Sequence, residues 1–191
     1  MQILRHAQYR RMPWKNGGGE TTEIAVFPPD ASVDSFEWRI SMATVSSDGP
    51  FSLFEGIDRT LSILEGDGIT LAVDGAMPVE LTRKTPPFAF AADVPAASRL
   101  LGGKVLDLNV MTRRGRFVHA VRRLVPSGET ADAPSPGLQL LICAEGEIAL
   151  GDAGAIVLSR YDAIFLDDDE ALPPLSATSP ALAYLITLQA V

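Results

Sequence analysis

Cysteine and histidine are scarce in this sequence, and their scarcity argues against several kinds of chemistry. Cys143 is the single cysteine among 191 residues, so no disulfide forms within the chain. It lies in the apolar run Leu140–Ala144, which predicts a buried strand and an unreactive thiol. The two histidines, His6 and His119, lie in separate strand patterns without a histidine neighbour. We therefore expect neither a three-ligand metal site nor a metal cofactor.

Long apolar runs and an excess of positive charge are also lacking. No run approaches the roughly 20 residues that a membrane-spanning helix requires, and the N-terminus lacks the apolar segment of a signal peptide. The formal net charge of −8 and the pI near 4.7 argue against a general nucleic-acid surface or attachment to anionic lipid. Together with the single cysteine, these features predict a cytoplasmic protein that binds neither nucleic acid nor membrane.

Short extended segments broken by Gly, Pro and Asp make up most of the chain, and no long amphipathic helical stripe is present. A hydrophobic content of 47% is enough for a real core. Strands spaced by roughly 8–12 residues are typical of a sandwich or barrel. The pattern predicts strands at 1–9, 21–27, 36–42, 60–64, 69–73, 79–81, 88–90, 106–113, 140–144 and 182–191.

The second half of the sequence repeats the first. Glu65-Gly66-Asp67-Gly68 is echoed by Glu145-Gly146-Glu147, and Leu81-Thr82-Arg83 by Leu158-Ser159-Arg160. The second copy is mainly aliphatic, whereas the first holds both tryptophans. A repeat of this length predicts two similar β units. We expect an all-β double cupin, made of two tandem jelly-roll barrels at 1–115 and 116–191, with the N-terminal strands as candidates to pair with the second barrel.

The stretch Pro13-Trp14-Lys15-Asn16-Gly17-Gly18-Gly19 combines an aromatic anchor, a charge and an amide with three consecutive glycines. Taken alone, it is most typical of a tight turn between strands. Its lysine precedes the glycines, so the spacing does not match a phosphate-binding loop.

Polar side chains embedded in the strand patterns of the first half form a second group of interest. The inner face of a small barrel is either packed or lines a ligand cavity. Arginine presents a planar fork that matches a carboxylate, while an aspartate suits a cationic or amide-like group on the same ligand. Structural Arg–Asp pairs at a barrel rim are the alternative. The group consists of Arg39, Ser41, Asp48, Asp58, Arg59, Asn109 and Arg113.

Motifs along nearly the whole chain resemble the HutD/Ves family. They are Trp14–Gly19 with Thr21 and Glu23, Trp38–Ser41, Asp48–Ser52, Phe54–Arg59, Leu64–Gly66 and Asp107–Arg114. The resemblance implies a bicupin that lacks metal-binding histidines and forms a homodimer. It further implies a role in bacterial histidine utilisation, as a modulator that binds a pathway intermediate such as urocanate or formiminoglutamate.

The expected function is therefore that of a metal-free regulatory protein that binds a small carboxylate metabolite. The residues favour binding over catalysis, and no catalytic residue is assigned. A hydrolase or isomerase acting on the same metabolite, and a stress-related interaction protein, are the alternatives. The predicted ligand-binding residues are Trp14, Lys15, Asn16, Gly17, Gly18, Thr21, Arg39, Ser41, Asp48, Asp58, Arg59, Asn109 and Arg113.

Overall fold

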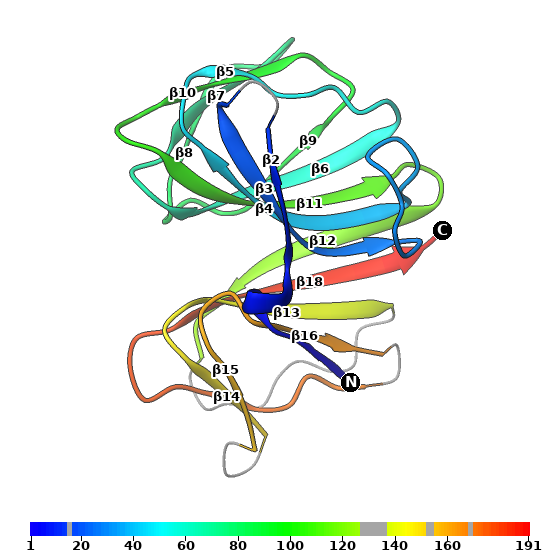
Figure 1. The fold of residues 1–191 in the computed structure, drawn as a ribbon, viewed down its shortest axis with the longest axis vertical. Coiled ribbons are helices and arrows are strands. Elements are labelled where there is room, and N and C mark those ends of the chain that lie inside the picture. Colours follow the sequence, from blue (N-terminus) through cyan, green and yellow to red (C-terminus); the bar gives the residue numbers. More distant parts are fainter. Residues whose placement is uncertain (15–16, 127–136, 152–154, 168–169) are drawn as a thin grey trace. The chain divides into compact units, whose positions relative to one another are not determined.

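The computed structural model describes residues 1–14, 17–126, 137–151, 155–167 and 170–191. Within these ranges the structure is almost entirely β, and the 3₁₀ turn η1 (His6–Gln8) is the only helical element (Figure 1). The prediction of an all-β fold is confirmed. No helix in the described ranges is long and apolar enough to cross a membrane.

The chain divides into two compact units. The N-terminal unit consists of Arg10–Val118 together with Val191, and the C-terminal unit consists of Met1–Tyr9 together with His119–Ala190. The main division of the chain thus falls after Val118, and the first nine residues belong with the second half of the sequence.

Two sheets build the N-terminal unit. One has the strand order β2-β3-β4-β11-β6-β9, and the other has the order β5-β10-β7-β8. The bounds are β2 (Arg10–Pro13), β3 (Gly19–Phe27), β4 (Trp38–Val45), β5 (Gly49–Pro50), β6 (Ile57–Glu65), β7 (Ile69–Val73), β8 (Val79–Leu81), β9 (Phe88–Ala91), β10 (Ala96–Leu100) and β11 (Val105–Arg113).

The described strands of the C-terminal unit also form two sheets. Their orders are β1-β16-β13-β18-β12 and β15-β14-β17, and β12 begins in the N-terminal unit. The bounds are β1 (Gln2–Leu4), β12 (Phe117–Leu124), β13 (Leu138–Glu145), β14 (Ile148–Leu150), β15 (Ile156–Leu158), β16 (Ala163–Leu166), β17 (Leu175–Ser176) and β18 (Leu182–Ala190).

The two units share a strand topology, in agreement with the sequence repeat. β6 pairs with β9 and β11, and β13 pairs in the same way with β16 and β18. Likewise β7 pairs with β8 and β10, and β14 pairs with β15 and β17. The turns after β6 and β13 each place a glycine at positive φ, Gly66 at +86° and Gly146 at +73°, where an L side chain is disfavoured. A repeated unit of this kind fits the predicted double cupin.

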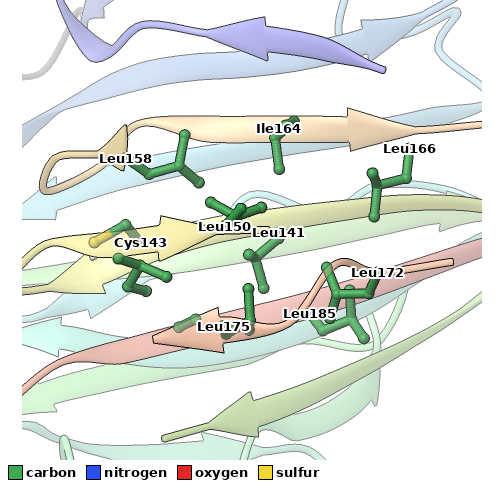
Figure 2. Close-up of a cluster of buried hydrophobic side chains, with 11 residues drawn as sticks. Leu141, Cys143, Leu150, Leu158, Ile164, Leu166, Leu172, Leu175 and Leu185 are labelled. Atoms are coloured by element: carbon green, nitrogen blue, oxygen red, sulfur yellow. The ribbon is translucent and has the colours of Figure 1, made fainter. Parts of the chain in front are cut away.

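The core of the C-terminal unit is a continuous aliphatic cluster (Figure 2). Leu141 on β13 pairs with Ile164 on β16 and with Leu185 on β18, so three strands contribute to one central row. All three side chains are buried, and Leu150 and Leu158 from the other sheet belong to the same cluster. Burial of this much apolar surface is the main force that holds the two sheets of the unit together.

The N-terminal segment departs from the single strand predicted at 1–9. β1 ends at Leu4, and the turn η1 separates it from β2. The carboxyl group of Asp162 accounts for the break, because it accepts hydrogen bonds from the backbone N of His6 at 2.9 Å and from Nη1 of Arg5 at 2.6 Å. These partners lie more than 150 residues apart in sequence, so no local pattern could indicate the turn.

Candidate ligand-binding site

The N-terminal unit contains a cavity of about 620 Å³, a size suited to a small organic molecule. Its lining comes from both sheets of that unit: strands β3, β4, β6 and β11 on one side, and the region around β5 and β10 on the other. The predicted ligand-binding residues that line it are Trp14, Gly18, Thr21, Arg39, Ser41, Asp48, Arg59 and Asn109.

Strand register explains why these polar side chains meet. Arg39 on β4 and Arg59 on β6 both pair with Met111 on the intervening strand β11. One row further along, Ser41 pairs with Asn109. Residues two positions apart on a strand point to the same side of the sheet, so both rows share the face that lines the cavity.

Arg59 is a buried cation in the cavity wall, with a relative exposure of 6%. Its Nε donates a hydrogen bond to Oδ1 of Asn109 at 2.8 Å, and its Nη2 donates to the same oxygen. Its guanidinium carbon lies 4.4 Å from the centre of the Phe51 ring. Burial lowers the pKa of Arg59 to about 10, so the group is charged at neutral pH. Nη1 has no acceptor among the described residues and remains available to a ligand.

Arg39 is the second buried guanidinium of the lining. Its Nε donates to Oε2 of Glu23 on β3 at 2.7 Å, and both side chains are largely buried. This direct ion pair offsets the charge of Arg39, whereas the direct acceptor for Arg59 is a neutral amide. Arg59 is therefore the stronger anion-binding group of the two.

Asn109 connects Arg59 to a buried carboxyl group. Its Nδ2 donates to Oδ1 of Asp107 at 2.5 Å, and Asp107 has no exposed surface. Burial is the main cause that raises the pKa of Asp107 to about 6. Asp107 is not among the predicted site residues, although the alternation of β11 already placed it on the same face as Asn109.

Trp14 and the glycine run form one end of the lining. The indole Nε1 donates to Oγ1 of Thr21 at 2.8 Å, and the backbone N of Trp14 donates to the carbonyl oxygen of Gly19 at 2.9 Å. A Cβ on Gly19 would lie 2.1 Å from the carbonyl oxygen of Thr44 and 3.0 Å from the Trp14 ring. The third glycine is thus required for close approach of β3 to β4 beneath the indole.

Replacing Gly19 with alanine is expected to reduce the free energy of unfolding by about 2 kcal/mol, because the obstructing Thr44 atom is backbone and cannot rotate away. Chemical denaturation measures the change. Gly49→Ala is the matched control, since nothing lies within 4 Å of its added Cβ. If both variants unfold at the wild-type midpoint, the close approach at Gly19 does not constrain the fold.

Several predicted residues lie outside the cavity lining. Asp58 directly precedes Arg59 on β6, so its side chain points to the other face, where Oδ1 accepts from Nη2 of Arg114 at 2.8 Å. Arg113 ends β11 and donates from Nε to the carbonyl oxygen of Phe36 at 3.0 Å. Both side chains bond to other parts of the protein and do not line the cavity.

The remaining predicted residues belong to the Trp14 turn. Gly17 has a φ of +71° and donates its N–H to the carbonyl oxygen of Trp14 at 3.0 Å, and it does not line the cavity. Lys15 and Asn16 lie outside the described residues.

The lining also contains residues that the sequence did not indicate as ligand-binding. Several of them, at positions 49–52, come immediately after Asp48 in the sequence. Oδ1 of Asp48 accepts a hydrogen bond from the backbone N of Leu100 at 2.8 Å, which connects this segment to β10. The only indication of these residues in the sequence was their position next to Asp48, which was itself a predicted ligand-binding residue. The additional residues are Met12, Pro13, Val33, Ala43, Val45, Ser47, Gly49, Pro50, Phe51, Ser52, Phe54, Ser98 and Met111.

The cavity lining includes neither of the two histidines, and it does not include the single cysteine. The His6 ring packs edge-on against Tyr9 and Tyr161, with ring centres 5.6 and 5.4 Å apart. Cys143 is fully buried, and burial raises the pKa of its thiol to about 11. Among the described residues, no group of three or more His, Cys, Asp and Glu side chains is placed to hold a metal ion.

Two positions of the polar network have apolar counterparts in the C-terminal unit. The two units can be aligned at a β-sheet irregularity beside each glycine turn. There Leu106 on β11 pairs with Glu65 on β6, and Leu182 on β18 pairs with Glu145 on β13. The place of Asp107 is then taken by alanine and the place of Asn109 by leucine, at positions 183 and 185. Arg59 itself is matched by the buried Gln139, so the C-terminal copy has lost the charge and the Asp–Asn pair and keeps one polar side chain there.

The repeated two-sheet topology defines a fold of the cupin class. The fold is similar to that of a cupin 2 conserved barrel domain protein from Leptotrichia buccalis, with a TM-score of 0.59 and 12% identity, covering 94% of this chain and 96% of that chain. At this identity the likeness concerns the fold alone.

Within that class the chain belongs to the HutD family, whose model matches residues 6–183. An uncharacterised 21.2 kDa protein from the hutC 3' region of Pseudomonas putida is 34% identical over 174 residues, 90% of each chain. Protein Ves of Citrobacter koseri is 41% identical over 62% of this chain and 63% of its own length. The predicted HutD/Ves membership is confirmed.

Solved structures agree with this assignment. A conserved protein of unknown function from Pseudomonas aeruginosa PAO1 has a TM-score of 0.85 and 34% identity, covering 98% of both chains. HutD from Pseudomonas fluorescens SBW25 has a TM-score of 0.74 and 28% identity, covering 100% of this chain and 98% of that chain.

Proposed function

We propose that this protein binds a small carboxylate metabolite in the cavity of its N-terminal unit and serves as a metal-free regulatory protein of histidine utilisation. The observation that carries the proposal is the buried guanidinium of Arg59 in the cavity wall, whose Nη1 has no protein acceptor among the described residues. A buried cation with unused donors favours an anionic ligand, and the planar fork of arginine matches a carboxylate.

The rest of the lining narrows the ligand class. Trp14, Phe51 and Phe54 provide apolar walls for a flat or aliphatic middle section. Asp48 lies in the part of the lining contributed by the other sheet and offers a carboxylate to a nitrogen-bearing group. A molecule with an acid at one end and a basic or amide nitrogen at the other satisfies both, and formiminoglutamate and urocanate have this form.

The histidine-utilisation context comes from relatives. The family bears the name HutD, and a relative covering most of the chain is named for its position beside hutC in P. putida. The net charge of −8 repels anions at long range, so capture depends on the local positive potential of Arg59. The homodimer implied by the family resemblance remains a prediction.

Isothermal titration calorimetry of the purified protein against formiminoglutamate, urocanate and glutamate tests the proposal. We expect saturable binding of one of the two pathway intermediates at micromolar to millimolar concentration, and weaker binding of glutamate, which lacks the terminal formimino group. Absence of binding by all three at millimolar concentration overturns the ligand assignment. Turnover of formiminoglutamate that is lost in Asp48→Asn assigns an enzyme in its place. A stable protein partner recovered with the cavity empty supports the interaction protein.

A further inference from the structure

Asp107 is an unusual buried residue on β11, in the six-stranded sheet of the N-terminal unit. It is fully buried, and its Oδ2 is the one buried side-chain oxygen or nitrogen in the described part of the chain that has no hydrogen-bond partner. An unpartnered ionised oxygen in such a place costs stability, so there must be a compensating advantage or a proton on the group. The β11 register places Asp107 one row beyond Asn109 on the cavity-facing side.

A chain of hydrogen bonds joins Asp107 to the cavity wall. Asp107 Oδ1 accepts from Nδ2 of Asn109 at 2.5 Å, and Oδ1 of Asn109 accepts from Nε and Nη2 of Arg59. The amide of Asn109 has one orientation that satisfies both neighbours, because only its NH₂ can donate to a carboxylate. Asp107 therefore determines which end of Asn109 faces the guanidinium, and with it how Arg59 is held.

The charges around Asp107 come from three neighbouring strands. Arg59 on β6 acts to lower the pKa of Asp107, as do the amide of Asn109 and the backbone of Ala43, but burial outweighs them and raises it to about 6. Arg39 on β4 is already paired with Glu23 on β3. Arg59 is thus the cation that Asp107 depends on, and Asp107 in turn acts to raise the pKa of Arg59.

We propose that Asp107 is a positioning residue that orients Arg59 through Asn109 and takes up one proton when a carboxylate occupies the cavity. This inference rests on the proposed function. A carboxylate bound at Arg59 competes with Asp107 for the same cation and adds a second negative charge in a buried setting. The proton comes from solvent and binds to Oδ2, and no other bond is made or broken.

Linkage sets the sign of the effect. Because the bound ligand favours protonated Asp107, protonation of Asp107 favours the ligand equally. Affinity is highest below the pKa of free Asp107, about 6, and falls by up to roughly tenfold for each pH unit above it, until the pKa of the ligand-bound form is reached.

Formate is the probe that tests this coupling, because it is the smallest carboxylate and stays ionised from pH 5.5 to 8.0. The dissociation constant is measured by NMR titration across that range. We expect wild-type affinity to fall at least tenfold from pH 6 to pH 8. Asp107→Asn, which keeps an acceptor for Asn109 but carries no charge, is expected to bind formate independently of pH and at pH 8 more tightly than wild type.

Two further variants separate positioning from a general structural role. Asp107→Ala removes the acceptor for Asn109 and is expected to weaken formate binding about tenfold at pH 6, a loss that the asparagine variant does not show. Asp58→Asn, the same change on β6 outside the cavity lining, is expected to keep the wild-type pH profile. Should the alanine variant fail to fold, carboxyl ¹³C shifts of wild-type Asp107 report its titration with and without formate.

The outcomes distinguish this inference from the proposed function. Formate binding with a pH-independent dissociation constant, or a titration of Asp107 that formate leaves unchanged, overturns the coupling and leaves carboxylate binding intact. An Asp107→Asn variant that still shows the wild-type pH profile also overturns it. Failure of formate and of every pathway intermediate to bind at pH 5.5 overturns the proposed function itself.

Discussion

Replacing Arg59 with alanine is expected to weaken binding of the pathway carboxylate by at least about 100-fold. The guanidinium is buried in the cavity wall, and its Nη1 has no acceptor among the described residues, so a bound carboxylate would take up a donor that the protein leaves unused. Hydrogen bonds to charged groups contribute about 1.5–3 kcal/mol each, and about 1.4 kcal/mol corresponds to a tenfold change in dissociation constant. Calorimetry on the purified variant measures the loss.

Two substitutions define the origin of that effect. Arg59→Lys keeps the charge but loses the planar fork that bonds to Asn109, so an intermediate loss of affinity is expected. Arg114→Ala removes an exposed arginine that pairs with Asp58 and Asp93 outside the lining, and it is expected to bind as wild type. Wild-type affinity in Arg59→Ala would place the carboxylate elsewhere and contradict the site.

The two-residue period of the strands accounts for most of what could be predicted. The alternation around Arg39 and Ser41 correctly placed both on one face of a strand, and the structure turns that face to the cavity. The same rule separates Asp58 from Arg59, since consecutive strand residues point to opposite sides. The structure accordingly has Arg59 in the cavity lining and Asp58 outside it.

Contacts between distant segments account for what could not be predicted. The tie between Asp48 and Leu100 spans 52 residues, and the bond between Arg59 and Asn109 spans 50. Which strand lies between two others is decided by the whole barrel, so the meeting of Arg39, Met111 and Arg59 follows from register and not from any local motif. The burial of Asp107 is a consequence of the same register. It could not be predicted locally, because an aspartate in a strand pattern is more often exposed.

Divergence of the two copies explains why the polar network around Arg59 belongs to the N-terminal unit. Both copies have the same strand pairings and the same glycine turn, so the backbone requirements were retained. Asn109 and Asp107 have leucine and alanine at the matching positions, and the C-terminal unit uses those positions for packing. Its Leu141 then has apolar neighbours on both adjacent strands.

Truncation of Leu141 to alanine is accordingly expected to cost about 2–5 kcal/mol of unfolding free energy. The side chain is fully buried at the centre of the aliphatic cluster, between Ile164 on β16 and Leu185 on β18 (Figure 2). A cavity left between paired strands closes only in part, so the cavity term adds to the lost transfer free energy. Such a cost is a large share of the roughly 5–15 kcal/mol that stabilises a typical domain. Guanidinium denaturation followed by circular dichroism measures it.

Val157→Ala provides the comparison, since Val157 lies on β15 of the same unit with 46% of its surface exposed. Its expected cost is below about 0.5 kcal/mol, because nearly half of the Val157 surface is already exposed to water and surface substitutions of this kind cost little. A loss below about 1 kcal/mol for Leu141→Ala would show that neighbouring side chains refill the space, as in a loosely packed core. We expect a large difference between the two variants, because Leu141 packs in an aliphatic core. In this copy of the repeat, that core has Ala183 and Leu185 at the positions that Asp107 and Asn109 hold near Arg59.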